Sequence, residues 1–65
     1  MIIIYSTGCP KCRVLEAKIA SKFANYHTCE DLDIMEQKGI MSVPTLEVDG
    51  EMMDFSQAIA WVNAH

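Results

Sequence analysis

Residues 4–12 read IYSTGCPKC, and this stretch carries the strongest structural signal in the 65-residue chain. Its apolar start belongs to the run Met1–Ser6, which is rich in isoleucine and lacks the alternation of a half-buried strand. Such a run predicts a strand that is buried on both faces. Thr7 and Gly8 break the run, and Pro10 suits the first turn of a helix, where its missing N–H has no partner to lose. The stretch therefore predicts a strand, a turn and then a helix that starts at the two cysteines.

The helix is expected to run from Pro10 to about Asn25. Its apolar residues recur at spacings of three, four and four and so share one face: Cys12, Leu15, Ile19 and Phe23. Most of its lysines fall on the opposite side, whereas Glu16 sits near the apolar stripe. We expect the apolar stripe to pack on the sheet.

Five further elements follow from local signals downstream. Strands are expected at Tyr26–Cys29, Thr45–Val48 and Glu51–Met53. Helices are expected at Leu32–Lys38 and, from their helical spacing, over Phe55, Ala58, Ile59 and Val62. Asp31 is the expected N-cap of the second helix, and Asp54 or Ser56 is that of the last one. Gly39 is an expected helix end, and Asp49-Gly50 is a two-residue hairpin turn. The order β-α-β-α-β-β-α predicts an α/β domain with a mixed four-stranded sheet flanked by three helices.

Composition restricts the classes of function. A chain of 65 residues holds one domain, which we assign to residues 1–65. Hydrophobic residues make up 51% of the chain, which excludes a disordered tail, and no apolar run approaches the ~18 residues of a membrane span. The net charge of −4 argues against a nucleic-acid partner. We therefore expect neither a membrane nor a nucleic acid among the partners.

Charge is distributed unevenly along the chain. Residues 1–29 carry four basic side chains and one acidic one, whereas residues 30–65 carry one basic and eight acidic side chains. The positive charge thus surrounds the cysteine pair, either as a solvated helix face or as a field that steers an acidic partner.

The three cysteines favour redox chemistry over a disulfide scaffold. Small secreted scaffolds carry an even set of cysteines, whereas this chain has three, two of them in Cys9-Pro10-Lys11-Cys12. Cys9 lies where the helix presents free N–H groups and the positive end of its dipole, and Lys11 adds charge of the same sign. Such a position lowers a cysteine pKa from ~8.5 to about 3.5–7.5 and so favours the attacking thiolate.

The helical spacing assigns the two thiols different roles. Cys12 falls on the apolar stripe and is expected to be buried, whereas Cys9 is expected to be exposed at the helix tip. Cys9 is then the nucleophile that attacks a substrate disulfide, and Cys12 is the resolving thiol. Two alternatives stay open: a structural disulfide, and a zinc or interaction module in which Cys9, Cys12, His27 and Cys29 hold the metal.

At this point the chain resembles the thioredoxin/glutaredoxin superfamily, and in particular its small glutaredoxin-like redoxins. Residues 4–12 are similar to the strand-to-helix active site of glutaredoxins, and residues 39–50 are similar to their segment of Gly, Thr-Val-Pro, strand and Asp-Gly turn. The resemblance implies a thioredoxin-like, glutaredoxin-type fold and a dithiol–disulfide oxidoreductase with no metal and no tightly bound cofactor.

The resemblance also implies roles for residues outside the cysteine pair. Pro10 and Lys11 belong to the active-site loop, and Pro44 corresponds to a proline that follows a cis peptide bond. Val43 would then pair its backbone with the substrate. Apart from the resemblance, Tyr5 is expected to pack beside the active-site loop and is a further candidate for substrate contact. Met41 is a candidate for the lining of the substrate groove.

Partners follow from the same resemblance. The substrate is expected to be a protein with a disulfide, such as ribonucleotide reductase, and the electrons are expected to come from thioredoxin reductase or glutathione. Glutaredoxins hold glutathione with a Gly-Gly pair and acidic residues after the fourth strand. Residues 52–56 of this chain lack the Gly-Gly pair, and Asp54 is the nearest counterpart of the acidic residues. A working thiol pair further predicts a cytoplasmic protein, and we expect it to be monomeric.

Overall fold

The chain follows the expected order of elements in a computed structural model that describes residues 1–65. The elements are β1 (Ile2–Tyr5), α1 (Pro10–Lys22), β2 (His27–Cys29), α2 (Leu32–Gln37), β3 (Thr45–Val48), β4 (Glu51–Met53) and α3 (Phe55–Ala64). The longest helix, α1, has 13 residues, and none of the three helices combines the length and hydropathy that a bilayer span requires.

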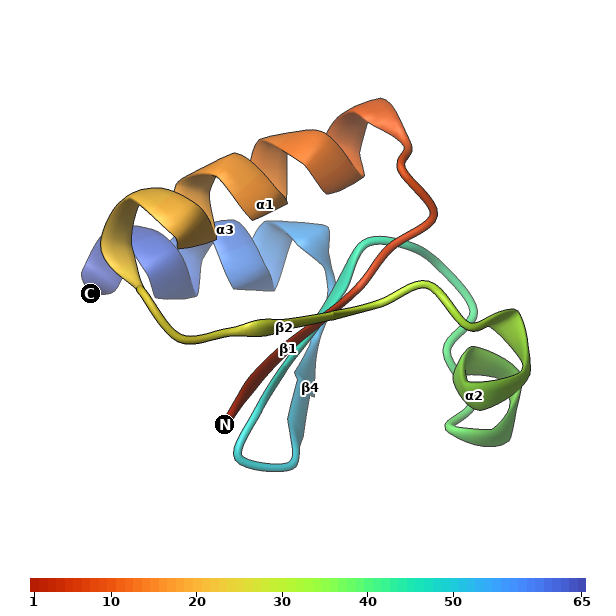
Figure 1. Ribbon diagram of the computed structural model, residues 1–65. Coiled ribbons are helices and arrows are strands. Elements are labelled where there is room, and N and C mark those ends of the chain that lie inside the picture. Colours follow the sequence, from red (N-terminus) through yellow and green to blue (C-terminus); the bar gives the residue numbers. More distant parts are fainter.

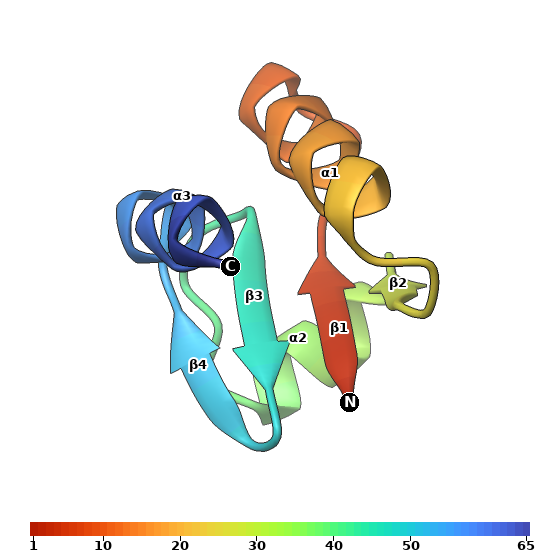
Figure 2. The same ribbon diagram turned by 90° about the vertical axis from the view of Figure 1, so that its left-hand side faces the viewer.

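The four strands form one mixed sheet in the order β2-β1-β3-β4. β1 runs parallel to β2 and antiparallel to β3, and the β3–β4 hairpin supplies the second antiparallel pair (Figure 2). Ile4 lies opposite Thr28 on one side and Leu46 on the other. β1 is therefore a central strand, which explains why its apolar residues do not alternate with polar ones.

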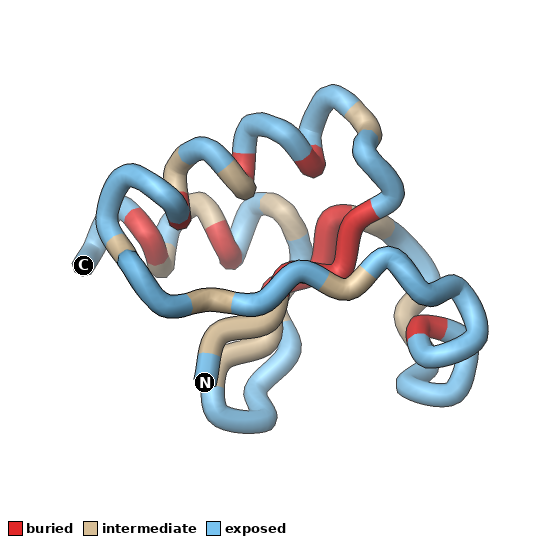
Figure 3. Tube along the Cα trace, viewed as in Figure 1, coloured by how far each residue is buried: buried red, intermediate tan, exposed pale blue.

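Helices α1 and α3 lie side by side over one face of this sheet (Figures 1 and 2). Six buried residues form the core between them and the strands: Ile4, Leu15, Ile19, Leu46, Ala58 and Val62. In Figure 3 the buried positions of both helices lie on the sides that face the sheet. The apolar stripe expected on the first helix is thus the surface that holds α1 in place.

α1 ends earlier than the sequence suggests, at Lys22 instead of about Asn25. Phe23 leaves the helix with an extended backbone, φ −127° and ψ 130°, and its ring stacks on Trp61 with the ring centroids 5.3 Å apart. The helix thus ends at the residue whose ring meets Trp61 of α3. Packing between the two helices therefore decides where α1 stops.

Local signals fix the remaining ends. Asp31 accepts hydrogen bonds from the first turn of α2, and Gly39 follows that helix with φ +73°. Asp49 and Gly50 both have positive φ, as a two-residue hairpin turn requires. Asp54 and Gln57 form a reciprocal capping box at the start of α3.

The opposite face of the sheet is covered only at one end. α2 lies on that side, near the point where β1 leads into the cysteine loop (Figure 1). Met35 is its one buried residue. The short second helix thus leaves part of this face open and brings Glu36 to the surface beside Thr7.

Candidate active site

The cysteine pair lies where the central strand passes into α1. Ser6, at the end of the strand run, is fully buried, and its N–H donates to the Cys29 carbonyl at 3.0 Å. Gly8 then adopts φ +80°, which allows the chain to turn away from the sheet and into α1. Cys9 is the N-cap of α1, and Pro10 occupies the first helical turn.

Cys9 and Cys12 form a disulfide with their Cα atoms 5.0 Å apart. This separation lies within the range of about 4.4–6.8 Å for unconstrained disulfides, so the bond closes without moving the backbone. Cys9 Sγ also accepts a hydrogen bond from the Cys12 N–H at 3.2 Å. The sulfur of Cys9 therefore takes the place that a capping oxygen has in other helices and meets one of the free N–H groups of the helix start.

The two sulfurs differ in burial. Cys12 is fully buried on the same face of α1 as Leu15 and Ile19, as expected. Cys9 is only half-buried, not fully exposed as expected, because its sulfur bends back over the first turn to cap the helix. A reaction partner from solvent thus reaches Cys9 and not Cys12.

The loop before β3 comes to the same surface. The Val43–Pro44 peptide bond is cis, as the resemblance implied, and the Pro44 side chain is fully buried. The backbone hydrogen bonds of the chain leave the Val43 N–H and C=O unpaired. Val43 and Thr7, two residues before Cys9, line one hollow. Residues more than thirty positions apart in the sequence are thereby brought together beside the cysteines.

Pro10 and Lys11, the two residues between the cysteines, are both exposed in the first turn of α1. The Lys11 ammonium lies 5.6 Å from the centre of the Phe55 ring, at the start of α3. This cation–π contact joins the cysteine end of α1 to the start of α3. The positive charge of Lys11 thus lies near the cysteine pair, as the sequence suggested.

Tyr5 is not placed to contact a substrate, which corrects the sequence-based expectation. Its side chain is buried on the sheet face that α1 and α3 do not cover, and its hydroxyl donates to Glu47 Oε1 at 2.8 Å. Burial, followed by the bond to Glu47, raises the pKa of Tyr5. The reason is strand alternation: Ile4 faces the core under α1, so its neighbour points away.

Tyr5, Glu47 and Lys38 form a polar cluster that ties α2 to the sheet. Lys38 Nζ lies 3.4 Å from Glu47 Oε1 and 5.8 Å from the centre of the Tyr5 ring. The Tyr5 hydroxyl and then Lys38 hold the pKa of Glu47 below its usual value, against the opposing effect of burial. The neighbouring Tyr5 hydroxyl and Glu47 carboxylate raise the pKa of Lys38.

The four side chains of the zinc alternative are not brought together. His27 and Cys29 lie opposite Ile3 and Tyr5 in the sheet, so they project on the face away from α1. Cys9 and Cys12 lie on the helix side. No group of three or more His, Cys, Asp or Glu side chains is arranged to hold a metal ion.

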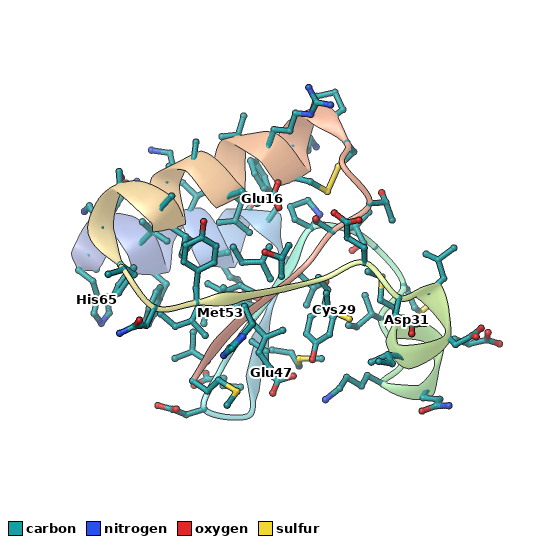
Figure 4. The ribbon with its side chains drawn as sticks, in the orientation of Figure 1. Glu16, Cys29, Asp31, Glu47, Met53 and His65 are labelled. Atoms are coloured by element: carbon teal, nitrogen blue, oxygen red, sulfur yellow. A yellow bond between two sulfur atoms is a disulfide. The ribbon has the colours of Figure 1, made fainter.

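Glu16 lies one turn after Cys12 on α1 and is half-buried (Figure 4). The buried Ser6 hydroxyl donates to its Oε1 at 3.4 Å. This contact accounts for a carboxylate beside the apolar stripe of α1, because it gives the buried hydroxyl an acceptor.

Sequence reasoning found the cysteine loop, Val43 and Met41 but missed the contribution of α2 to this surface. The hollow beside Thr7 is also lined by Leu32, Met35, Glu36 and Ile40. The sequence signal that could have indicated this contribution was Leu32, an apolar residue between Asp31 and Asp33.

No model of a protein family matches the chain, and neither a curated protein nor a solved structure is found to be similar to it.

Proposed function

We propose that this chain is a thiol–disulfide oxidoreductase that reduces protein disulfides through Cys9 and Cys12. One observation carries the proposal: a half-buried cysteine caps α1 and is bonded to a fully buried cysteine one turn later. A structural disulfide has no need of a partly accessible sulfur at a helix start. That position stabilises a thiolate, the species that attacks disulfides.

The fold supports the same proposal. A mixed sheet in the order β2-β1-β3-β4, with two helices on one face, is similar to the arrangement of glutaredoxin-type members of the thioredoxin superfamily. We therefore place the chain with the small glutaredoxin-like redoxins. A protein with a working dithiol belongs in a reducing compartment, for which we propose the cytoplasm, and the size of the domain suits a monomer.

The reaction begins from the reduced protein. The Cys9 thiolate attacks one sulfur of the substrate disulfide, so a bond from Cys9 to that sulfur forms while the substrate S–S bond breaks and its other sulfur leaves with the electron pair. Cys12 then attacks Cys9, which forms the intramolecular disulfide and releases the second substrate sulfur. Two electrons have passed to the substrate, and its two sulfurs take up protons as thiols.

Burial keeps the two steps in order. Because Cys12 has no exposed surface, it meets only the sulfur of Cys9, which the first turn of α1 holds next to it. The free N–H and C=O of Val43 are suited to pair with the backbone of the substrate cysteine, as an added strand pairs with a sheet edge.

Insulin reduction tests this proposal. The dithiothreitol-reduced protein, freed of reductant, is expected to reduce insulin or a model disulfide and to lose two thiols as it does so. Cys9→Ser should abolish the reaction, and Cys12→Ser should accumulate a mixed disulfide through Cys9. Cys29→Ser is the matched control and should keep the activity. A Cys9→Ser protein that still reduces the disulfide would overturn the proposal.

The electron source is tested on the oxidised protein. We propose thioredoxin reductase with NADPH, and not glutathione, as the reductant. The Asp54 carboxylate, the nearest counterpart of the acidic residues that hold glutathione, is occupied by the Gln57 N–H in the α3 capping box. Counting free thiols after exposure to each reductant should show two new thiols with the reductase, whereas reduction by glutathione alone would contradict this choice.

A further inference from the structure

A hollow of about 340 Å³ lies beside the cysteine loop and is built from three separate segments. Its lining residues are Thr7 from the loop before Cys9, Leu32, Met35 and Glu36 from α2, and Ile40, Met41, Ser42 and Val43 from the segment before the cis peptide bond. Two of the apolar ones are unusually exposed, since Leu32 is 64% and Met41 98% accessible. The hollow is therefore open to a partner at the end of the molecule where Cys9 is accessible.

Glu36 is the only charged side chain in this lining. It forms no ion pair within the chain, because the one lysine near α2, Lys38, is paired with Glu47 on the other side of the helix. Leu32 and Glu36 are one turn apart on α2 and so lie on the same side of the helix. The Glu36 carboxylate, which has no ion-pair partner, thus lines a hollow whose other side chains are apolar or neutral.

We propose that this hollow takes a lysine or arginine side chain of the substrate segment that carries the disulfide. The proposal rests on the proposed oxidoreductase function and adds a substrate class to it: disulfides whose cysteine is flanked by a basic residue. The alkyl stem of the basic residue packs along Leu32 and Met41, and its cationic end pairs with Glu36.

The chemistry of the hollow favours this occupant over the alternatives. Long basic side chains cover apolar surface with their stems while the charged end stays at a polar edge. The volume is at the lower end of the range for ligand pockets, about 300–1,000 Å³, and suits one long side chain instead of a whole helix. An acidic side chain would face Glu36 with the same charge, and a purely apolar one would leave that carboxylate without a partner.

This assignment revises the electrostatic picture drawn from the sequence. The basic residues of α1 do surround the cysteine pair along the chain, but the fold also brings acidic α2 to the surface beside it. The substrate therefore meets positive charge on the α1 side of Cys9 and negative charge in the hollow.

Short peptides with one central cysteine test the proposal. Each peptide carries its cysteine as a mixed disulfide with 5-thio-2-nitrobenzoate, and release of the coloured thiolate by the reduced protein gives the second-order rate constant. An arginine, its apolar analogue norleucine or a glutamate is placed in turn at each of the three positions before and after the cysteine. At the position that reaches the hollow, we expect arginine to react about 1.5- to 5-fold faster than norleucine, as an exposed ion pair allows.

Salt and charge variants identify the source of that preference. The arginine advantage should shrink at high ionic strength because the pair is exposed. Glu36→Gln should remove the advantage of arginine over norleucine. Asp33→Asn is the matched control, since it makes the same charge change on α2 at a residue outside the hollow, and it should keep the advantage.

The outcomes separate this proposal from the function on which it rests. If no peptide releases the coloured thiolate with the reduced wild-type protein, the oxidoreductase function itself fails. If all peptides react but arginine has no advantage at any position, or keeps it in Glu36→Gln, the substrate class is wrong while the function stands. Loss of the advantage in Asp33→Asn as well would show general charge steering and would equally overturn the assignment to the hollow.

Discussion

At the scale of single residues, the difference between Cys9 and Cys12 comes from one turn of helix. Cys9 sits at the free N–H groups of the helix start, whereas Cys12 points into the core between α1 and the sheet. The two side chains are identical in chemistry, so the different roles that we propose for them derive entirely from burial and position. That difference gives a prediction which does not depend on any substrate.

Limited alkylation of the reduced protein with iodoacetamide should modify Cys9 first. Cys12 should stay unmodified until much of Cys9 has reacted, because it has no exposed surface. Cys29 serves as an internal reference: it is half-buried like Cys9 but ends strand β2 and does not cap a helix, because Asp31 is the N-cap of α2. Mass spectrometry of the digested protein measures all three sites together, and equal rates at Cys9 and Cys29 would contradict activation by the helix.

The Tyr5–Glu47 hydrogen bond gives a second prediction at this scale. Tyr5→Phe removes the donor but keeps the buried ring, so the free energy of unfolding should fall by about 1.5–3 kcal/mol, as expected for a bond to a charged acceptor. Urea unfolding at neutral pH measures this change. Tyr26→Phe, on a half-buried ring whose hydroxyl bonds to no other side chain, is the matched control and should change stability little.

The same variant should also change how stability depends on acid. The pKa of Glu47 is lower in the folded protein than its ordinary value of 4.5. The stability that the ionised Glu47 contributes is therefore complete above this ordinary value, and it is lost as the pH falls through the lower pKa of the folded protein. Tyr5→Phe removes the largest cause of this lowering. Its unfolding free energy should therefore fall less than that of the wild type between neutral and acidic pH, and parallel curves would contradict the assigned cause.

At the scale of elements, capping determines where α3 begins. Asp54 accepts from the Gln57 N–H at 2.8 Å, and the Gln57 side chain accepts from the Asp54 N–H at 3.1 Å. Asp54→Ala should cost about 0.5–2 kcal/mol of stability, as loss of a helix cap does, and lower Tm by about 4–8 °C for each kcal/mol. Ser56→Ala in the same turn is the control, because its hydroxyl makes no hydrogen bond within the chain. Equal effects of the two substitutions would rule out a stabilising cap.

Elements were predictable from the sequence where their signals are local. The caps Asp31 and Asp54, the turn Asp49-Gly50 and the order of strands and helices all depend on neighbouring residues, and the structure has them. The end of α1 was misplaced by about three residues, because it is set by the stacking of Phe23 on Trp61. A contact between residues 38 positions apart leaves no mark in the local pattern.

At the scale of the whole molecule, the candidate site likewise has one part that follows from local sequence and another that depends on contacts between distant residues. The Cys9–Cys12 pair has a fixed spacing on one helix, so its geometry could be foreseen. The placement of α2 could not, since it depends on Met35, Tyr5, Glu47 and Lys38 meeting across the sheet. For that reason the sequence suggested Tyr5 as a substrate contact, although Tyr5 holds α2 in place. Nothing in the sequence indicated that Glu36 lines the hollow.

The last prediction concerns the stability of the whole domain in its two redox states. The disulfide closes a loop across a sequence separation of only three residues, so its contribution through the unfolded chain is about 2 kcal/mol, against about 4.7 for a 100-residue loop. A domain of this size has a total stability of roughly 3–10 kcal/mol. None of the six residues that form the core between α1, α3 and the sheet is a cysteine.

The protein should therefore stay folded when it is reduced, as the proposed turnover between dithiol and disulfide requires. Urea unfolding with and without dithiothreitol should show a single transition in both states, with the reduced form less stable by about 2 kcal/mol or less. The Cys9→Ser, Cys12→Ser double variant is the control, and it should unfold like the reduced protein at any redox potential. Unfolding of the domain on reduction would mean that the bond serves as a structural staple, and the oxidoreductase proposal would then fail at its first step.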